Sequence, residues 1–297
     1  MKKTVYAIIN PVSGKGSKAK IKDLLSDMNN ESYEVTLFQT EYPNHATEIA
    51  QKAVENKIDI VVAVGGDGTI NEIAGALVGS NVALGIIPCG SGNGLSRHLC
   101  IPMSAKKALD IIKNGHVERI DYGKANDRLF FCTCGVGYDA KVSEKALTQK
   151  KRGILMYAKN MITTFISYKP ESYKIVCEEQ IFENEVYVIT FSNASQYGNN
   201  AYIAPRATVR DGKMNIAILK PISFINLPVL MTQMFTKRIT NNKKFFEIVA
   251  SKATIIRERE GVMHLDGNAV YEAKEVNIEI IPEGLNVFIP QHKSSVI

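Results

Sequence analysis

Three glycine-bearing segments in the first third of the chain carry the residue types that hold phosphate groups. They are Asn10-Pro11-Val12-Ser13-Gly14-Lys15-Gly16, Gly65-Gly66-Asp67-Gly68-Thr69 and Gly90-Ser91-Gly92-Asn93-Gly94. Glycine lets the backbone approach a ligand closely, and a helix that begins at such a turn points its N–H groups at an anion. One such segment is a weak signal, but three together predict a site for a phosphate-bearing ligand.

Asp67 is the one acidic side chain within these segments. A carboxylate beside phosphates is repulsive on its own, but it becomes useful where it holds Mg²⁺ or accepts a proton from an attacking hydroxyl group. The alternative is that Asp67 caps the helix that begins near Thr69. Thr69 and Ser91 either cap helices or donate to phosphate oxygens, and Lys15 either reaches the phosphates or is solvated. No Walker A or dinucleotide G-x-G-x-x-G motif is present, which excludes a standard P-loop or Rossmann NAD site.

The elements that must position these segments alternate between strand and helix over the first ~120 residues. Strands are predicted at Thr4–Asn10, Tyr33–Gln39, Ile58–Val64 and Val82–Ile87, and helices at Lys18–Met28, Ala46–Glu55, Ile70–Leu77 and Ser104–Lys113. This alternation predicts an α/β domain with a parallel sheet. Because the carboxyl ends of parallel strands meet at one edge of the sheet, all three glycine segments are expected there.

The pattern changes after residue ~120 to short, closely spaced strands that predict a mostly antiparallel β domain. They are Arg128–Cys134, Tyr173–Cys177, Glu185–Phe191, Lys213–Leu219, Phe245–Ala250, Ala253–Glu258, Val276–Ile281 and Asn286–Ile289. Glu178-Glu179, Asp211-Gly212 and Glu283-Gly284 are predicted turns. Two apolar helices are expected within this domain, at Ile154–Ser167 and Phe224–Thr236, and each either belongs to the core or faces an acyl chain or a membrane.

Composition and charge narrow the class of protein. The 297 residues are 45% hydrophobic and 22% charged, and no stretch of ~18 uncharged apolar residues occurs, so we expect a cytoplasmic protein with peripheral membrane contact. The odd count of five cysteines argues against a disulfide framework, and Cys132-x-Cys134 is read as two small buried residues rather than metal ligands.

The net charge of +6 has two local sources. Basic residues cluster at Lys141, Lys145, Lys150, Lys151 and Arg152, and again at Lys237, Arg238, Lys243 and Lys244. These clusters are either solvated faces or contacts for anionic lipid head groups. Charge alone is compatible with nucleic acid, but no recognition motif accompanies it, so no nucleic acid is expected. The sequence leaves the oligomeric state open, a homodimer included.

Six motifs occur in a fixed order along the chain. They are Asn10-Pro11-x-Ser13-Gly14, Thr40-Glu41-x-x-Asn44-His45-Ala46, Gly65-Gly66-Asp67-Gly68-Thr69 with Asn71-Glu72, Pro88-x-Gly90-Ser91-Gly92-Asn93, Gly135-x-Gly137-x-Asp139-Ala140 and Asp266-Gly267. This set resembles the diacylglycerol kinase catalytic-domain family, which includes bacterial lipid kinases and the sphingosine and ceramide kinases. GGDGT alone is shared with NAD kinases and phosphofructokinases, whereas the ordered set is far more specific.

The resemblance implies an ATP-binding α/β domain over residues 1–122, a lipid-binding β-sandwich over 123–284, and a segment 285–297 whose strand returns to the first domain. It implies catalysis in the cleft between them, with Mg²⁺ carried by ATP. Nucleotide-binding residues would be Asn10, Pro11, Ser13, Gly14, Thr40, Gly65, Gly66, Gly68, Thr69, Glu72, Gly90, Ser91, Gly92 and Asn93. Asp67 would orient Mg-ATP or act as base, and Asp139 would lie near the lipid head group unless it is an ordinary strand-end carboxylate.

Two departures from the family pattern bear on these roles. Many bacterial members have Asp-Gly-Glu, with the Glu a proposed base, where this chain has Asp266-Gly267-Asn268. Asn cannot accept a proton near neutral pH, so either Asp67 or Asp266 is the base, the transfer needs little base, or activity is low; we favour Asp67. Asp211 matches a residue that binds a structural Mg²⁺ in some members, but Arg210 precedes it here, which favours an ordinary Asp-Gly turn.

The resulting expectation is a kinase for diacylglycerol or a sphingoid-type base. One alternative is a nucleotide-regulated lipid-binding protein with little turnover, which Asn268 favours. The other is an NAD kinase, which lacks support because no T-P-T-G-S-T-A-Y motif is present in the second domain.

Overall fold

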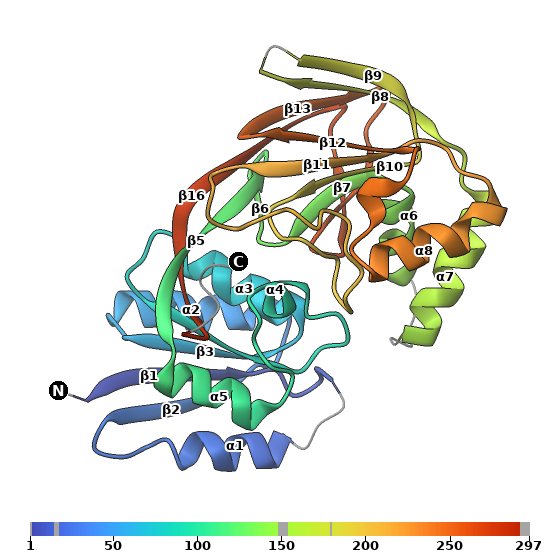
Figure 1. Ribbon diagram of the computed structural model, residues 1–297. Coiled ribbons are helices and arrows are strands. Elements are labelled where there is room, and N and C mark those ends of the chain that lie inside the picture. The colour runs from blue at the N-terminus through green and yellow to red at the C-terminus, as the bar shows by residue number, and fades with distance from the viewer. Residues whose placement is uncertain (1, 15–17, 148–153, 179, 292–297) are drawn as a thin grey trace. The chain divides into compact units, whose positions relative to one another are not determined.

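The computed structural model describes residues 2–14, 18–147, 154–178 and 180–291. The chain forms two compact units (Figure 1). The first unit comprises residues 1–121 and 282–297, and the second comprises residues 122–281. The divisions thus fall at 121/122 and 281/282, where the sequence predicted 122/123 and 284/285. Lys15 and the basic run 150–152 lie outside the described residues.

The first unit is built on a parallel sheet. Its strands are β1 (Lys3–Ile9), β2 (Tyr33–Gln39), β3 (Ile60–Gly65), β4 (Ala83–Pro88) and the last part of β16 (Glu275–Ile289), in the order β2-β1-β3-β4-β16. Every residue of β3 and β4 is buried, because helices cover a parallel sheet on both faces. β16 joins this sheet in parallel through Val287 beside Leu84. The predicted α/β fold of this unit is therefore confirmed.

Helices follow the strands as the alternation predicts. They are α1 (Lys18–Ser26), α2 (His45–Glu55), α3 (Asp67–Leu77), α4 (Gly94–His98) and α5 (Ala105–Asn114). Each longer helix turns one apolar stripe to the sheet; α3, for example, buries Ile70, Ile73 and Leu77. α3 begins directly after β3, and α4 begins a few residues after β4. The glycine segments lie at these two junctions and after β1.

The second unit is an antiparallel sandwich, as the resemblance implied. One sheet has the strand order β12-β11-β10-β7-β14-β15, and the other continues from the first part of β16 through β13 and β8 to β9. The strands are β7 (Thr133–Gly137), β8 (Glu171–Cys177), β9 (Gln180–Val186), β10 (Val188–Ser192), β11 (Met214–Leu219), β12 (Phe245–Ala250), β13 (Lys252–Arg257), β14 (Gly261–Leu265) and β15 (Asn268–Glu272). Alternate residues of both sheets, such as Phe191, Ile216, Ile255 and Ile278, share one core. β5 (His116–Ala125) pairs with β6 (Arg128–Phe130) and with β16.

A second apolar cluster packs helices onto this sandwich. The helices are α6 (Tyr138–Leu147), α7 (Ile154–Ser167), η1 (Phe224–Asn226), α8 (Leu227–Phe235) and η2 (Ile239–Asn241). Phe165 of α7 and Leu230 and Met234 of α8 are buried in the cluster with Tyr138 and Tyr187. Among the described helices, none is long and apolar enough to cross a membrane.

The strand predicted at Glu185–Phe191 is divided at Tyr187 between β9 and β10. Two further predicted boundaries were wrong for local reasons. The single strand expected at Arg128–Cys134 is split into β6 and β7, because the backbone N–H groups of Phe131 and Cys132 donate to a carboxylate instead of a neighbouring strand. The turn expected at Glu283-Gly284 lies inside β16. There Glu283 has a φ of 51° and its N–H donates to the Asp121 carboxylate at 2.9 Å, so the strand bends without ending.

Candidate active site

The three glycine segments lie against one another at the carboxyl edge of the parallel sheet. A Cβ atom on Gly90 would lie 2.7 Å from the Cα of Gly66, and one on Gly14 would lie 1.7 Å from the carbonyl oxygen of Cys89. Gly14 also has a φ of 71°, which disfavours other residues. These glycines therefore allow three turns from distant parts of the sequence to pack backbone against backbone.

Asp67 joins two of the turns. Its Oδ2 atom accepts a hydrogen bond from the N–H of Asn93 at 2.8 Å, and its Oδ1 atom accepts one from Gly94 at 2.8 Å. It caps α4, because α4 begins at Gly94, whereas its own helix α3 has Gly66 at the N-cap and no side-chain cap. The alternative that Asp67 caps the helix near Thr69 is therefore wrong.

Burial is the largest influence on the pKa of this carboxyl group. Burial raises the pKa of Asp67, and hydrogen bonds from the backbone of Asn93, Gly94 and Asp67 itself, together with the nearby charge of Arg97, only partly oppose that rise. A carboxylate with a raised pKa is a stronger proton acceptor than an ordinary aspartate.

Amide side chains hold the turns in shape. The Nδ2 atom of Asn10 donates to the Thr69 hydroxyl at 2.9 Å, which ties the first turn to the second. Asn93 closes its own turn by accepting from the Gly90 N–H at 3.0 Å and donating to the Gly90 carbonyl at 2.8 Å. The Ser13 hydroxyl donates to the Asn10 carbonyl at 3.0 Å. These residues were predicted to bind nucleotide, and the structure gives each a bond that orders a turn.

Some of the other residues predicted to bind nucleotide make contacts that hold neighbouring segments, and the rest are exposed. Glu72 accepts from the backbone of Asn44 and Ala46 at the start of α2, and burial raises its pKa. Thr40 follows β2 and donates its N–H to the Ile9 carbonyl at 3.0 Å. The Gly92 carbonyl accepts from Arg97 at 3.0 Å, and the Gly65 backbone packs on Thr69. Pro11 and Ser91 are exposed on the turns, and Gly68 is exposed in the first turn of α3.

Asp139 lies in a polar cluster of the second unit, at the start of α6. Its Oδ2 atom accepts from the Thr190 hydroxyl at 3.1 Å and the Tyr197 hydroxyl at 2.9 Å, and it lies 3.0 Å from Nε2 of His264. A Cβ atom on Gly135 would lie 2.9 Å from that same Nε2 atom, so glycine leaves room for the pair. None of these three partners of Asp139 was predicted from the sequence. Of the three, only His264 is marked in the sequence, as a polar residue within the apolar run of β14.

Asp266 accepts hydrogen bonds from three consecutive backbone N–H groups. They belong to Phe131 at 2.7 Å and to Cys132 and Thr133 at 2.8 Å each. Asp266 itself has a φ of 48°, in the turn between β14 and β15. Both carboxylate oxygens are thus engaged in holding the segment between β6 and β7.

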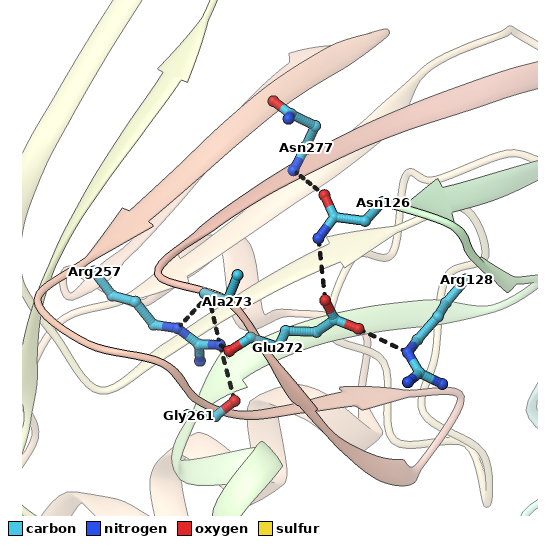
Figure 2. Close-up of polar contacts among 7 residues, drawn as sticks. All are labelled: Asn126, Arg128, Arg257, Gly261, Glu272, Ala273 and Asn277. Carbon is cyan, nitrogen blue, oxygen red and sulfur yellow. Dashed lines mark hydrogen bonds and ion pairs between the residues drawn. The ribbon is translucent and has the colours of Figure 1, made fainter.

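A buried arginine fixes the hairpin that carries Asp266 (Figure 2). The Arg257 guanidinium donates to the carbonyls of Gly261 at 2.8 Å, Val262 at 3.0 Å, Glu272 at 2.6 Å and Ala273 at 3.0 Å. It therefore clamps the outer ends of β14 and β15.

The Glu272 carboxylate extends this network on the other side of the hairpin. It accepts from Arg128 at 2.7 Å and from Asn126 at 3.0 Å. Asn126 in turn accepts from the N–H of Asn277 at 3.0 Å, as Figure 2 shows. The base of the β14–β15 hairpin is thereby tied to β16 as well as to β13. Asn268, the first residue of β15, is exposed.

The predicted structural metal residue lies in an ordinary turn. Asp211 accepts from the N–H of Lys213 at 3.0 Å, and Gly212 has a φ of 67°. Within the described ranges, no group of three or more His, Cys, Asp or Glu residues is arranged to hold a metal ion. The Asp-Gly turn favoured from the sequence accounts for this geometry.

Two known family domains together match most of the chain. The diacylglycerol kinase catalytic domain matches residues 4–125, and the "YegS C-terminal NAD kinase beta sandwich-like domain" matches residues 132–289. A protein of Staphylococcus epidermidis named diacylglycerol kinase is 27% identical over 297 residues, covering 98% of this chain and 93% of its own. A protein of the same name from Staphylococcus aureus is 27% identical over 296 residues, with the same two coverages.

Solved structures share the fold. The crystal structure of a diacylglycerol kinase from Bacillus anthracis has a TM-score of 0.76 at 21% identity, covering 99% of this chain and 98% of its own. An NAD kinase from Archaeoglobus fulgidus in complex with ATP has a TM-score of 0.55 at 16% identity, covering 96% and 93%. These likenesses show the fold alone. Together with the matched domains and the converging motifs, they lead to one assignment: the chain belongs to the diacylglycerol kinase catalytic-domain family, a family of lipid kinases.

Proposed function

We propose that this protein transfers the γ-phosphate of ATP to the hydroxyl group of a membrane lipid, either diacylglycerol or a sphingoid-type base. The observation that carries the proposal is the packing of three glycine turns around Asp67 at the carboxyl edge of the parallel sheet. Exposed backbone at Gly68 and Ser91, beside the start of α3 and before α4, offers N–H groups to phosphate oxygens.

In this proposal the first unit binds the donor and the second binds the acceptor. The lipid hydroxyl oxygen attacks the γ-phosphorus, the bond from that phosphorus to the β–γ bridging oxygen breaks, and ADP leaves. The hydroxyl proton passes to the Asp67 carboxylate, whose pKa burial raises. Asp266 is the weaker candidate for base, because three backbone N–H groups occupy its carboxylate. Asp139 is proposed to lie near the lipid head group.

The donor set at the turns fits Mg²⁺ that arrives with the nucleotide. Asp67 uses one lone pair of each carboxylate oxygen on an amide N–H, which leaves further lone pairs for an ion or its water. Mg²⁺ is commonly held by one or two carboxylates together with substrate phosphates and waters. When bound, the ion would neutralise charge on the β- and γ-phosphates. Asp211 is not needed for this role.

The direct test is transfer of labelled phosphate from ATP to extracted total lipid, comparing the wild type with Asp67→Asn. We expect a phosphorylated lipid from the wild type and a loss of at least about 100-fold in the variant, the usual range for a general base. No lipid product from the wild type would refute kinase activity. Equal product from both proteins would remove Asp67 from the mechanism.

A companion variant addresses the missing family glutamate. If Asp67 is the base, Asn268→Glu changes the rate by less than about threefold, because proton transfer is already provided for. A rise of 10-fold or more would show that position 268 is the deficient base site and that the natural protein turns over slowly.

We further propose that the protein works at the cytoplasmic face of the membrane, where ATP is available, and that its contact with the bilayer is peripheral. The lipid substrate requires such contact, and the excess of basic residues suits anionic head groups.

A further inference from the structure

Exposed apolar side chains gather on α7, η1 and α8 of the second unit. Ile225 of η1 is 85% exposed and Ile166 of α7 is 74% exposed. Ile162, Phe224, Val229 and Phe235 are also exposed on these three elements. The rings of Phe165 on α7 and Phe224 on η1 have centroids 5.7 Å apart, and α7 and α8 pack on the same apolar cluster. We call these six exposed residues the α7–α8 surface.

The same helices use their opposite faces for the core. Phe165, Leu230 and Met234 are buried in the cluster that packs against the sandwich. Phe224 lies partly over Phe165, whereas the other five residues of the α7–α8 surface are exposed and are absent from the set of side chains that form this cluster. Isolated exposed apolar residues are normal, but a gathered group of large ones marks a contact with a partner or a membrane.

The distribution of charged residues indicates the chemistry of a partner for this surface. Residues 145–170 contain six basic residues and no acidic one, and so do residues 213–246. These two segments flank and include α7 and α8, and they hold 12 of the 36 basic residues and none of the 30 acidic ones. The rest of the chain consequently has more acidic than basic residues. The positive excess of this protein thus lies in the segments that carry the exposed apolar side chains.

Basic side chains follow directly on the apolar ones. Lys237 and Arg238 lie just beyond Thr236, the residue that ends α8, and are exposed, and so are Lys243 and Lys244 before β12. The N–H of Lys220 donates to the Lys244 carbonyl at 3.0 Å, which brings the strand that leads into η1 beside this second pair. Among the described residues, no ion pair engages these five cations.

We propose that the α7–α8 surface docks on an anionic lipid bilayer, with its apolar side chains at head-group depth and the surrounding Lys and Arg side chains on anionic head groups. An apolar group bordered by cations is the pattern of an interfacial membrane contact. A second copy of this chain is disfavoured as occupant, because it would bring two strongly basic surfaces together. The purpose of the contact rests on the proposed lipid substrate, but its test does not.

The apolar part is tested by sedimentation with vesicles of phosphatidylglycerol and phosphatidylcholine. We expect Ile225→Ser with Val229→Ser to weaken binding to phosphatidylglycerol vesicles at least about tenfold. The matched control is Ile181→Ser, which removes an exposed isoleucine from β9 of the same unit and should bind like the wild type. Equal binding by all three proteins would overturn the proposal.

The charged part is tested by reversal of charge. Lys243→Glu with Lys244→Glu should lower affinity at least about 20-fold, since each basic residue near a bilayer contributes about fivefold. The control is Lys106→Glu with Lys107→Glu on α5, an equal change of net charge in the first unit, and it should retain most of the binding. Added salt should weaken the wild type steeply. Salt-independent binding, or an equal loss in the control, would overturn the charge assignment.

Two further measurements separate this proposal from its competitors. Phosphorylation of lipid in detergent micelles needs no bilayer, so loss of vesicle binding with micellar activity retained would support docking. A wild type that phosphorylates micellar lipid but binds no vesicle would overturn docking and leave the proposed function standing. A wild-type dimer in the absence of lipid that Ile225→Ser makes monomeric would show that a second copy covers this surface instead.

Discussion

Nε2 of the buried His264 lies 3.0 Å from Oδ2 of Asp139, and Gly135 leaves the space that the pair occupies. The Nδ1 atom of His264 is buried and has no hydrogen-bond partner among the described residues. Thr190 and Tyr197 donate to the same carboxylate oxygen. The pair holds Asp139 in one orientation at the start of α6, which makes His264 a positioning residue for the carboxylate proposed to meet the lipid.

Replacing His264 should therefore weaken the binding of lipid more than the binding of nucleotide. We expect His264→Ala to lower the free energy of unfolding by about 2–4 kcal/mol, because it leaves a cavity and an under-satisfied carboxylate. The KM for lipid should rise while the dissociation constant for ATP is unchanged. Tyr197→Phe removes one donor from the same oxygen and should cost only about 1 kcal/mol. A weakened affinity for ATP with an unchanged KM for lipid would contradict this role.

Substitutions at Gly14 and Gly68 test two different roles of glycine, the packing of the turns and the binding of phosphate. Gly14→Ala should destabilise the protein by more than about 2 kcal/mol, since its Cβ would overlap the Cys89 carbonyl and its φ is 71°. A Cβ atom on residue 68 would have no other atom within 4 Å, and alanine favours the helix more than glycine does. Gly68→Ala should therefore leave the free energy of unfolding unchanged or raise it by up to about 1 kcal/mol. If a triphosphate approaches α3, however, Gly68→Ala should weaken ATP binding at least about tenfold. Calorimetric titration and urea unfolding measure both, and unchanged ATP affinity would place the phosphates elsewhere.

The raised pKa of Asp67 has a definite consequence for stability. The unfolded chain ionises this group near its ordinary pKa, about 3.9, whereas the folded protein ionises it at higher pH. The folded state therefore binds more protons in the window between the two pKa values, and the stability that this group contributes is lost as pH rises through it. Urea unfolding should be compared for the wild type and Asp67→Asn from about pH 4 to about pH 7. The free energy of unfolding of the wild type should fall relative to that of the variant as the pH rises. A difference that grows in favour of wild type would show that the amide hydrogen bonds outweigh burial.

The clamp at the β14–β15 hairpin should depend on the shape of Arg257, not only on its charge. Lysine cannot donate to four carbonyls at once, so Arg257→Lys should lower the free energy of unfolding by about 2–4 kcal/mol. Arg128→Lys alters the exposed partner of Glu272 and should cost less than about 1 kcal/mol. Denaturant unfolding distinguishes them, and equal losses would mean that charge alone matters.

Hydrophobic periodicity and the order of motifs determined much of this protein. The buried runs of β3 and β4 and the alternation of strands with helices predicted the parallel sheet, and the glycine segments predicted that three turns meet at its carboxyl edge. These features depend on neighbours in sequence, so local rules are sufficient for them. The same rules failed where distant residues intervened: Asp266 interrupts the predicted strand at residue 131, and Asp121 keeps β16 continuous through Glu283.

Only the tertiary structure decided which side chains meet. No local pattern could reveal that Asp67 caps α4, that Asp139 pairs with His264 across 125 positions, or that Arg257 clamps the next hairpin. Nor could periodicity tell which face of α7 and α8 is buried, because both faces are apolar. Each of these outcomes depends on how strands far apart in sequence are paired, and that pairing is fixed by the packing of the whole unit rather than by any segment of it.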